Sequence, residues 1–330
     1  MSYRRFVLTA ALAAMVVWLS QPRAAAQVRR SSAKAKAAAE KRNPPRTPDG
    51  QPDLQGYWTN ATTTPLERPT EFTGKQILTE QEAVEFQERV LRPSGEGPPG
   101  LQAGSSISDF WFERGNLVEG RRSSLIVDPP DGRIPPLTPA ARERAAALAP
   151  ERRLHPADGP EDRSLSERCL LWATAGPPML PTGYNSNYQI VQAPGYVVIL
   201  VEMIHDARII PLDGRPHLGA DVRQWLGDSR AHWEGNTLVV ETTNFTGKTA
   251  FRGSGEGLHL IERFTRTDPE TIKYEFTVND PATFTRPWSA EIPMRKTKGP
   301  IYEYACNEGN YALADILRGA RTEERNAASK

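Results

Sequence analysis

The second half of the chain alternates apolar and polar residues over short stretches. In residues 272–278, Ile272, Tyr274, Phe276 and Val278 share one face, and the residues between them are polar. Strict alternation with a period of two is typical of a β-strand that is buried on one side. We therefore expect this part of the chain to build a sheet with one face on a core.

Turn sequences divide the same region into successive strands. Turns near residues 194–195, 234–236 and 268–269 each separate two apolar stretches, which predicts three hairpins. Further strands are predicted in "ARIIP", "RPWSAEIPMRK", "GPIYEYAC", around residues 54–59 and after residue 121. Roughly ten strands joined mostly by tight turns favour a mainly β fold, an antiparallel barrel or a sandwich.

Helical patterns are confined to the first half of the chain. Thr79 begins "TEQEAVEFQERVL" and Glu82 follows three residues later, which is a capping box. A second helix is predicted from Thr138, with Pro139 at its first position. The sequence around these helices is rich in Pro, Gly and Ser. We therefore expect a helix- and loop-rich insertion at residues 67–180 within a single barrel domain at residues 47–330.

The first 26 residues have the composition of a signal peptide. Arg4 and Arg5 precede the apolar run "FVLTAALAAMVVWL", and Ala24–Ala26 supply small residues for cleavage after Ala26. The run is shorter than the roughly 20 residues of a spanning helix, so no integral membrane segment is expected after cleavage. The predicted location is periplasmic or secreted, with general and twin-arginine export left open.

Charge changes the expected partners. The chain has 41 basic and 40 acidic residues; residues 1–26 hold three arginines, and residues 27–46 hold seven basic residues and one acidic residue. Residues 27–46 are predicted to be a disordered basic linker. The remainder has 41 − 3 − 7 = 31 basic and 40 − 1 = 39 acidic residues. An acidic body disfavours nucleic acid as a partner, because phosphate neutralisation dominates that binding.

The two cysteines, Cys169 and Cys306, predict one disulfide, because an even pair in an exported protein is usually oxidised. No HxH or HExxH spacing is present, and no P-loop, dinucleotide fingerprint or G-x-S-x-G elbow appears. We therefore expect neither a metal nor an organic cofactor.

Glu262 is the most suggestive carboxylate. It falls in the same alternating series as Leu258, Leu260 and Phe264, and so is predicted to face the core. A buried carboxylate is costly unless it is paired or hydrated. Two interpretations are left open: a general acid/base or ligand anchor with a shifted pKa, or a structural ion pair with an arginine, the candidates being Arg208, Arg263 and Arg266.

A second polar group follows a wholly apolar strand, in "EMIHDARIIP". His205 is a candidate for proton transfer near neutral pH, with Asp206 to orient it, while a solvated turn is the alternative. Because both faces of residues 197–205 are apolar until Glu202 and His205, one of these two is expected to point inward or to lie at the barrel mouth.

Aromatic residues suggest the kind of ligand. The residues predicted to line a site for a small apolar or aromatic molecule, with Arg208 and Glu262 as polar anchors, are Trp233, Trp288, Tyr304 and the acidic Glu241. Ordinary core filling is the alternative for at least half of the strand tryptophans.

Several longer motifs carry a resemblance. "PDLQGYWTN", "SSLIVDPPDGRIPPL", "DARIIPLDGRPH", "GDSRAHWEGNTLVVETTNF" and "EYACNEGN" resemble a family of secreted bacterial proteins of unknown function. The "GYW" strand and the "W-x-G-x-T-L" hairpin also look like the calycin, or lipocalin-like, superfamily, which implies a calycin-like barrel. Neither resemblance supplies catalytic residues, because one barrel fold serves both carriers and enzymes.

Three functions follow as hypotheses. The first is binding of a small apolar or aromatic molecule by the exported barrel. The second is a cofactor-independent acid/base enzyme, a lyase, isomerase or hydratase, using His205 and Glu262. The third is an interaction protein of the cell envelope. The sequence leaves the oligomeric state open.

Overall fold

A computed structural model describes residues 44–91, 113, 115–249 and 251–329. The predicted signal peptide, residues 27–43 of the predicted linker and most of the loop predicted after residue 91 lie outside the described residues. Contacts divide the chain into a small unit, Met1–Pro45 with Thr267–Pro269, and a large unit, Arg46–Arg266 with Glu270–Lys330. The core and the cavities considered below lie within the large unit.

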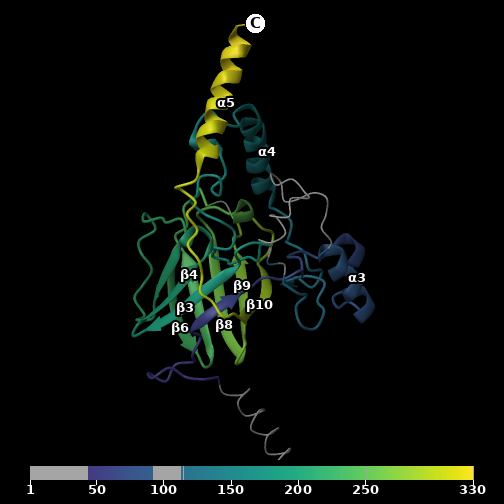
Figure 1. The fold of residues 1–330 in the computed structure, drawn as a ribbon, viewed down its shortest axis with the longest axis vertical. Helices are drawn as coiled ribbons and strands as arrows, with labels where there is room; N and C mark the ends of the chain where they lie inside the picture. Colours follow the sequence, from purple (N-terminus) through teal and green to yellow (C-terminus); the bar gives the residue numbers. More distant parts are fainter. Residues whose placement is uncertain (1–43, 92–112, 114, 250, 330) are drawn as a thin grey trace, which may run out of the picture. The chain divides into compact units, whose positions relative to one another are not determined.

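Ten strands form one sheet that curves around a common interior (Figure 1). They are β1 Gly56–Thr59, β2 Ile126–Asp128, β3 Asn187–Ala193, β4 Tyr196–Val201, β5 Ala207–Pro211, β6 Asp228–Glu234, β7 Thr237–Thr243, β8 His259–Asp268, β9 Thr271–Asn279 and β10 Trp288–Lys296. Their order is β5-β4-β3-β1-β10-β9-β8-β7-β6, and β2 pairs with β10 outside this path. Because β5 and β6 also lie next to each other, the nine strands make a nearly closed barrel.

The alternation predicted from the sequence is confirmed in the strands. Ile272, Tyr274, Phe276 and Val278 on β9 are buried, and the polar residues between them are only half-buried. On β8 the buried series includes Glu262, as the pattern predicted. The mainly antiparallel β-barrel expected from patterning is therefore the fold of this chain.

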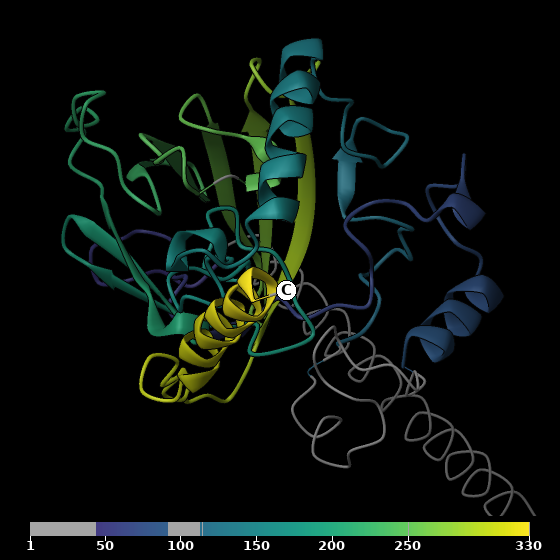
Figure 2. The same cartoon turned by 90° about the horizontal axis from the view of Figure 1, so that it is seen from above.

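The helices lie outside the sheet, and Figure 2 shows α3 away from α4 and α5. They are α3 Glu80–Leu91, α4 Pro139–Leu154 and α5 Tyr311–Ala328, with 3₁₀ turns η1 Thr70–Phe72, η3 Pro160–Asp162, η4 Met203–His205 and η5 Phe251–Gly253. The predicted capping box is present, because Thr79 N–H donates to Glu82 and Glu82 N–H donates to Thr79 Oγ1 at 3.2 Å. None of the helices within the described ranges combines the length and apolar composition of a membrane-spanning segment.

The sequence prediction was wrong near the C-terminus in two respects. Residues 299–306, "GPIYEYAC", are not a strand, although their Tyr-Glu-Tyr alternation imitates one. Gly299 adopts φ 55°, in the left-handed region, and Pro300 has no N–H to donate to a ladder. The following helix α5, begun by an Asn310 cap, was not predicted at all.

Part of the predicted insertion closes the barrel core. In residues 174–180, which we call the plug segment, Thr174, Ala175 and Met179 are fully buried. The Met179 N–H donates to the Tyr274 hydroxyl at 3.0 Å, and the Tyr188 hydroxyl donates to the Thr174 carbonyl at 3.0 Å. The plug segment is therefore held by tyrosines that project from two different strands of the barrel.

The predicted disulfide is present and ties the C-terminal segment to the chain just before the plug segment. Cys169 and Cys306 are bonded, their Cα atoms 5.7 Å apart and 137 positions apart in sequence. Asn310 adds a second link, since its side-chain amide donates to the Glu167 carbonyl at 2.8 Å. A disulfide fits an oxidising compartment such as the periplasm or the extracellular space.

Removal of this bond is expected to destabilise the protein. The double variant Cys169→Ser/Cys306→Ser should lose about 2–5 kcal/mol of unfolding free energy, because the unfolded chain regains the entropy of a long loop. Chemical denaturation of the oxidised wild type and the double variant measures the difference. Adding reductant should move the wild-type curve toward that of the variant and leave the variant unchanged; coincident curves from the start would contradict the prediction.

Candidate functional site

A charged pair lies in the barrel interior. Glu262 on β8 is fully buried, and both of its oxygens accept hydrogen bonds from Arg208 on β5, at 3.0 and 2.5 Å. Arg208 is itself buried and also donates to Ser229 on β6 at 3.3 Å. Of the three arginines considered as partners from the sequence, Arg208 therefore forms the bidentate pair, which joins β5 to β8.

One tyrosine, Tyr274, extends this pair into a network. The Tyr274 hydroxyl donates to Glu262 at 2.8 Å. Burial raises the pKa of Tyr274 well above its usual value, and the Glu262 charge raises it further, so this hydroxyl stays protonated. Burial lowers the pKa of Arg208, but the contact with Glu262 outweighs burial and the pKa is raised. Arg208 therefore keeps its positive charge beside the Glu262 carboxylate, and Tyr274 stays a hydrogen-bond donor to it.

The predicted proton-transfer residues lie away from this network. His205 is exposed on the 3₁₀ turn η4, whereas Glu262 is fully buried on β8. Among the described residues no hydrogen bond or ion pair joins them. Burial raises the pKa of Asp206, whose Oδ2 has no hydrogen-bond partner within the described part of the chain. His205 and Ile204 both adopt left-handed φ, 62° and 64°, which is strained for residues with a β-carbon.

The other residues predicted to bind ligand are scattered. Trp288 is fully buried among aromatic rings, including Phe276 at 5.6 Å between centroids. Trp233 and Glu241 are half-buried on β6 and β7, where Glu241 is in register with Arg230. Tyr304 is half-buried against Tyr184. Burial raises the pKa of Tyr304, and the neighbouring Tyr184 raises it further. Within the described part of the chain, Arg208 and Glu262 are the two members of the predicted set that hydrogen-bond to each other.

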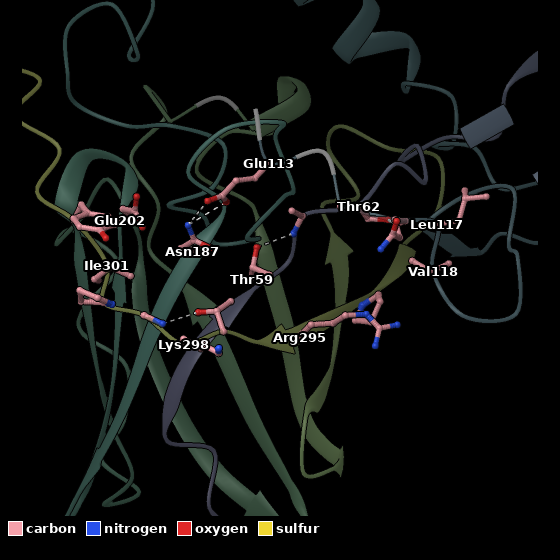
Figure 3. Close-up of a pocket in the computed structure, with 18 residues that line it drawn as sticks. Thr59, Thr62, Glu113, Leu117, Val118, Asn187, Glu202, Arg295, Lys298 and Ile301 are labelled. Atoms are coloured by element: carbon pink, nitrogen blue, oxygen red, sulfur yellow. Dashed lines mark hydrogen bonds between the residues drawn. The ribbon is translucent and has the colours of Figure 1, made fainter. Parts of the chain in front are cut away.

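A groove of about 490 Å³ lies on the outside of the barrel, and we call it the side groove (Figure 3). It forms where β3, β1 and β10 are adjacent, because Trp58, Tyr188 and Met294 point into the core and their strand neighbours point outward. Its walls are largely apolar. They include Ala61, Leu117, Val118, Pro293, Pro300 and Ile301.

Charged residues of both signs also line the side groove. Glu113 and Glu202 are the acidic members, and Arg295 and Lys298 the basic ones. Glu202 is only 4% exposed and accepts a hydrogen bond from the Asn185 amide at 2.7 Å. Burial raises the pKa of Glu202, and the Glu113 charge adds to the rise. The side groove therefore contains a desolvated carboxylate beside apolar surface.

The volume and the lining distinguish the side groove from two of the other hollows. A second hollow, of about 540 Å³, lies beside α3. The charged residues on its walls are all exposed: Glu80, Glu88, Glu119 and Arg121. An apolar hollow against the plug segment, lined by Trp172, Pro177 and Phe251, holds only about 180 Å³. Ligand sites usually have volumes of about 300–1,000 Å³ and a few buried polar groups. The side groove meets both conditions, and so does a hollow of about 320 Å³ lined by the buried Thr63 and Thr64. The side groove differs from that hollow because its lining includes a buried carboxylate, Glu202.

Sequence reasoning noted Glu202 but did not select it, and it missed Glu113, Asn187 and Lys298. The signal for Glu202 was available, since a carboxylate that ends a wholly apolar strand has few ways to be solvated. The Asn187 amide donates to both Glu113 oxygens, at 3.0 and 3.1 Å. No periodic pattern predicts that contact, because it joins residues 74 positions apart.

No three His, Cys, Asp or Glu side chains within the described ranges gather in a way that could hold a metal ion. A comparison of the chain with models of known protein families gives no match, and a search of curated proteins gives none either.

Proposed function

We propose that this protein binds a small organic molecule with an apolar or aromatic body, and that it does so in the side groove. One observation carries the proposal: the buried carboxylate of Glu202 borders a groove of about 490 Å³ whose other walls are mostly apolar. A polar group that fixes orientation, set in apolar surface, is the usual composition of a ligand site.

The barrel interior offers less support for the same function. Trp58, Trp288, Tyr188 and Tyr274 are fully buried there. The four cavities compared above include neither Arg208 nor Glu262 among their lining residues. The buried rings and the closed Arg208–Glu262 pair are what a filled core requires, so the proposed ligand is placed outside the barrel.

The compartment and the wider class are part of the same proposal. The disulfide supports an exported protein, as the N-terminal sequence predicts. Membership of the secreted bacterial family and the calycin-like assignment rest on sequence resemblance. The acid/base enzyme and the cell-envelope interaction protein stay predictions, because no contact of His205 with Glu262 supports the first and the basic linker lies mostly outside the described residues.

Blocking the side groove tests the proposal. A library of aromatic and aliphatic fragments is screened by saturation-transfer NMR, and dissociation constants are measured for the hits. In the Ile301→Trp variant the larger side chain should fill the groove and weaken those hits by at least about ten-fold, a cost of about 1.4 kcal/mol. The matched control is Ile209→Trp, which makes the same change at a residue that is 65% exposed on β5.

The result separates the side groove from other places. Hits weakened by Ile301→Trp and unchanged by Ile209→Trp support the proposal. If both variants bind the hits as tightly as the wild type does, the hits bind elsewhere on the molecule and the proposal is contradicted. An absence of hits also counts against the proposal. Circular dichroism and thermal unfolding of both variants check that the barrel is intact.

A further inference from the structure

We infer that the side groove recognises the ammonium group of an organic amine, held against Glu202 and Glu113, with the apolar body of the amine along the groove wall. This inference rests on the proposed function, since it names the chemical class of the ligand that the same groove takes. It follows from the negative charge of two carboxylates in the groove, for which the described residues supply no cationic partner.

Glu202 is placed for this role by the chain around it. It directly follows β4, and its N–H donates to the Asn187 carbonyl at 3.0 Å. Its carboxylate accepts from the Asn185 amide at 2.7 Å and lines the groove. More than nine-tenths of the residue is buried. A carboxylate this well fixed and this poorly hydrated gains more than a surface carboxylate when a cation approaches.

The second carboxylate increases that gain. Glu113 is held by the Asn187 amide, and its charge raises the pKa of Glu202 beyond the rise that burial alone causes. Among the described residues neither carboxylate forms an ion pair with a lysine, arginine or histidine. Amide donors satisfy hydrogen bonds but do not neutralise charge. The pair therefore presents negative charge that the described chain leaves uncompensated.

The basic residues of the groove do not fill this role. Arg295 pairs with Glu119 at 3.2 Å, and Lys298 is exposed and has no ion pair among the described residues. Figure 3 shows Glu113 and Asn187 above Thr59, and Lys298 and Arg295 below it. The positive end of a ligand is therefore favoured at the carboxylate end and disfavoured at the other.

An ammonium fits better than a metal ion at this place. Calcium takes six to eight oxygen ligands and magnesium about six, whereas an ammonium has three N–H donors to satisfy. Two carboxylates supply enough acceptors for an ammonium but too few ligands for calcium or magnesium. The apolar walls, which include Pro300 and Ile301, suit the carbon skeleton of an amine and offer no oxygen ligand to a hydrated ion.

Three matched probes test the inference. Phenethylamine, 2-phenylethanol and 3-phenylpropionate share an aromatic body and differ in carrying a positive, neutral or negative group. Their dissociation constants are measured by NMR titration at neutral pH and low salt. We expect phenethylamine to bind at least ten-fold more tightly than 2-phenylethanol, and 3-phenylpropionate to bind most weakly.

Variants locate the preference. Glu202→Gln should reduce the advantage of phenethylamine over 2-phenylethanol to less than three-fold and leave the alcohol nearly unchanged. Glu303→Gln is the matched control, because it removes an exposed charge one residue beyond the groove-lining Tyr302. The advantage should survive this control.

The outcomes separate the two proposals. If 2-phenylethanol binds as tightly as phenethylamine and Ile301→Trp weakens both, the amine inference is overturned and the ligand groove stands. If phenethylamine is preferred but Glu202→Gln and Glu303→Gln reduce the preference equally, the attraction is a general surface effect and the inference also fails. If phenethylamine does not bind at millimolar concentration, the inference is overturned. The fragment screen then tests by itself whether the groove binds a ligand.

Discussion

Replacing Arg208 by methionine is expected to lower the unfolding free energy by about 3–5 kcal/mol, because it leaves a charged carboxylate in the core without its partner. Glu262 is fully buried, and after the change the Tyr274 hydroxyl would be its one remaining side-chain donor among the described residues. Urea denaturation of wild type and variant, followed by tryptophan fluorescence, measures the loss.

A double variant keeps this prediction testable even if the single variant does not fold. Arg208→Met/Glu262→Met removes both charges and keeps the long side chains, so most of the lost stability should return. Replacing a buried ion pair with apolar residues is often neutral or stabilising, whereas breaking it is costly. The matched control is Arg263→Met on the same strand as Glu262, since Arg263 pairs with Glu234 at a site where both side chains are at least 40% exposed. Exposed pairs contribute only about 0–1 kcal/mol.

The same experiment distinguishes the two interpretations of Glu262. If the double variant recovers stability and still binds ligands of the side groove, the pair is structural. If the double variant folds but loses those ligands, the interior takes part in binding and our placement of the site outside the barrel is wrong. A single variant as stable as the wild type would show that Glu262 is not charged in the core or that the pair opens to water.

Most of the barrel could be predicted because its strands obey a local rule. Inward and outward residues alternate along β9, and the same rule placed Glu262 among the core positions of β8. Once a carboxylate is predicted inside a core, a cationic partner follows from electrostatics. Which arginine it would be did not follow, because β5 and β8 come together only when the sheet curves and its end strands meet.

The side groove could not be predicted in the same way. Its lining comes from five stretches far apart in sequence: residues 59–62, 113–118, Asn187, Glu202 and residues 293–302. None of these stretches has a motif that indicates binding. The groove forms because residues 297–302 leave the sheet after β10. The wrong prediction of a strand at residues 299–306 concealed it, since a further strand there would have paired with the edge instead of bordering a groove.

At η4 the residues selected from the sequence differ from the residue that lines the groove. Residues 202–206 were selected for His205 and Asp206, yet the member that reaches a cavity is Glu202. The strained backbone of Ile204 and His205 reverses the chain between β4 and β5 within a few residues. Such a short reversal keeps Glu202 at the strand end, against Asn185 and the groove. The turn is therefore significant for what it positions, whether or not His205 transfers protons.

Trp288→Ala is expected to cost about 3–5 kcal/mol, the usual loss when a large aromatic side chain is removed from a core. The indole is fully buried and is surrounded by Phe251, Phe276 and Phe284, whose ring centroids lie at 6.2, 5.6 and 6.1 Å. Phe276 is held by β9, and Phe251 lies on η5. We expect these rings to close only part of the space that the variant would open. Chemical denaturation measures the loss.

Trp288→Phe and Trp58→Phe make a matched comparison, because both tryptophans are fully buried. The Trp58 indole N–H donates to the Leu54 carbonyl at 2.9 Å, whereas the Trp288 N–H has no acceptor among the described residues. Phenylalanine at position 58 would break a hydrogen bond and leave a buried carbonyl unpaired, but at position 288 it would remove an unpaired donor, a difference of about 1–3 kcal/mol. Trp58→Phe should therefore be the more destabilising change. Equal losses would mean that the Trp288 N–H is satisfied in solution and that its ring packing alone sets the stability of this end of the barrel.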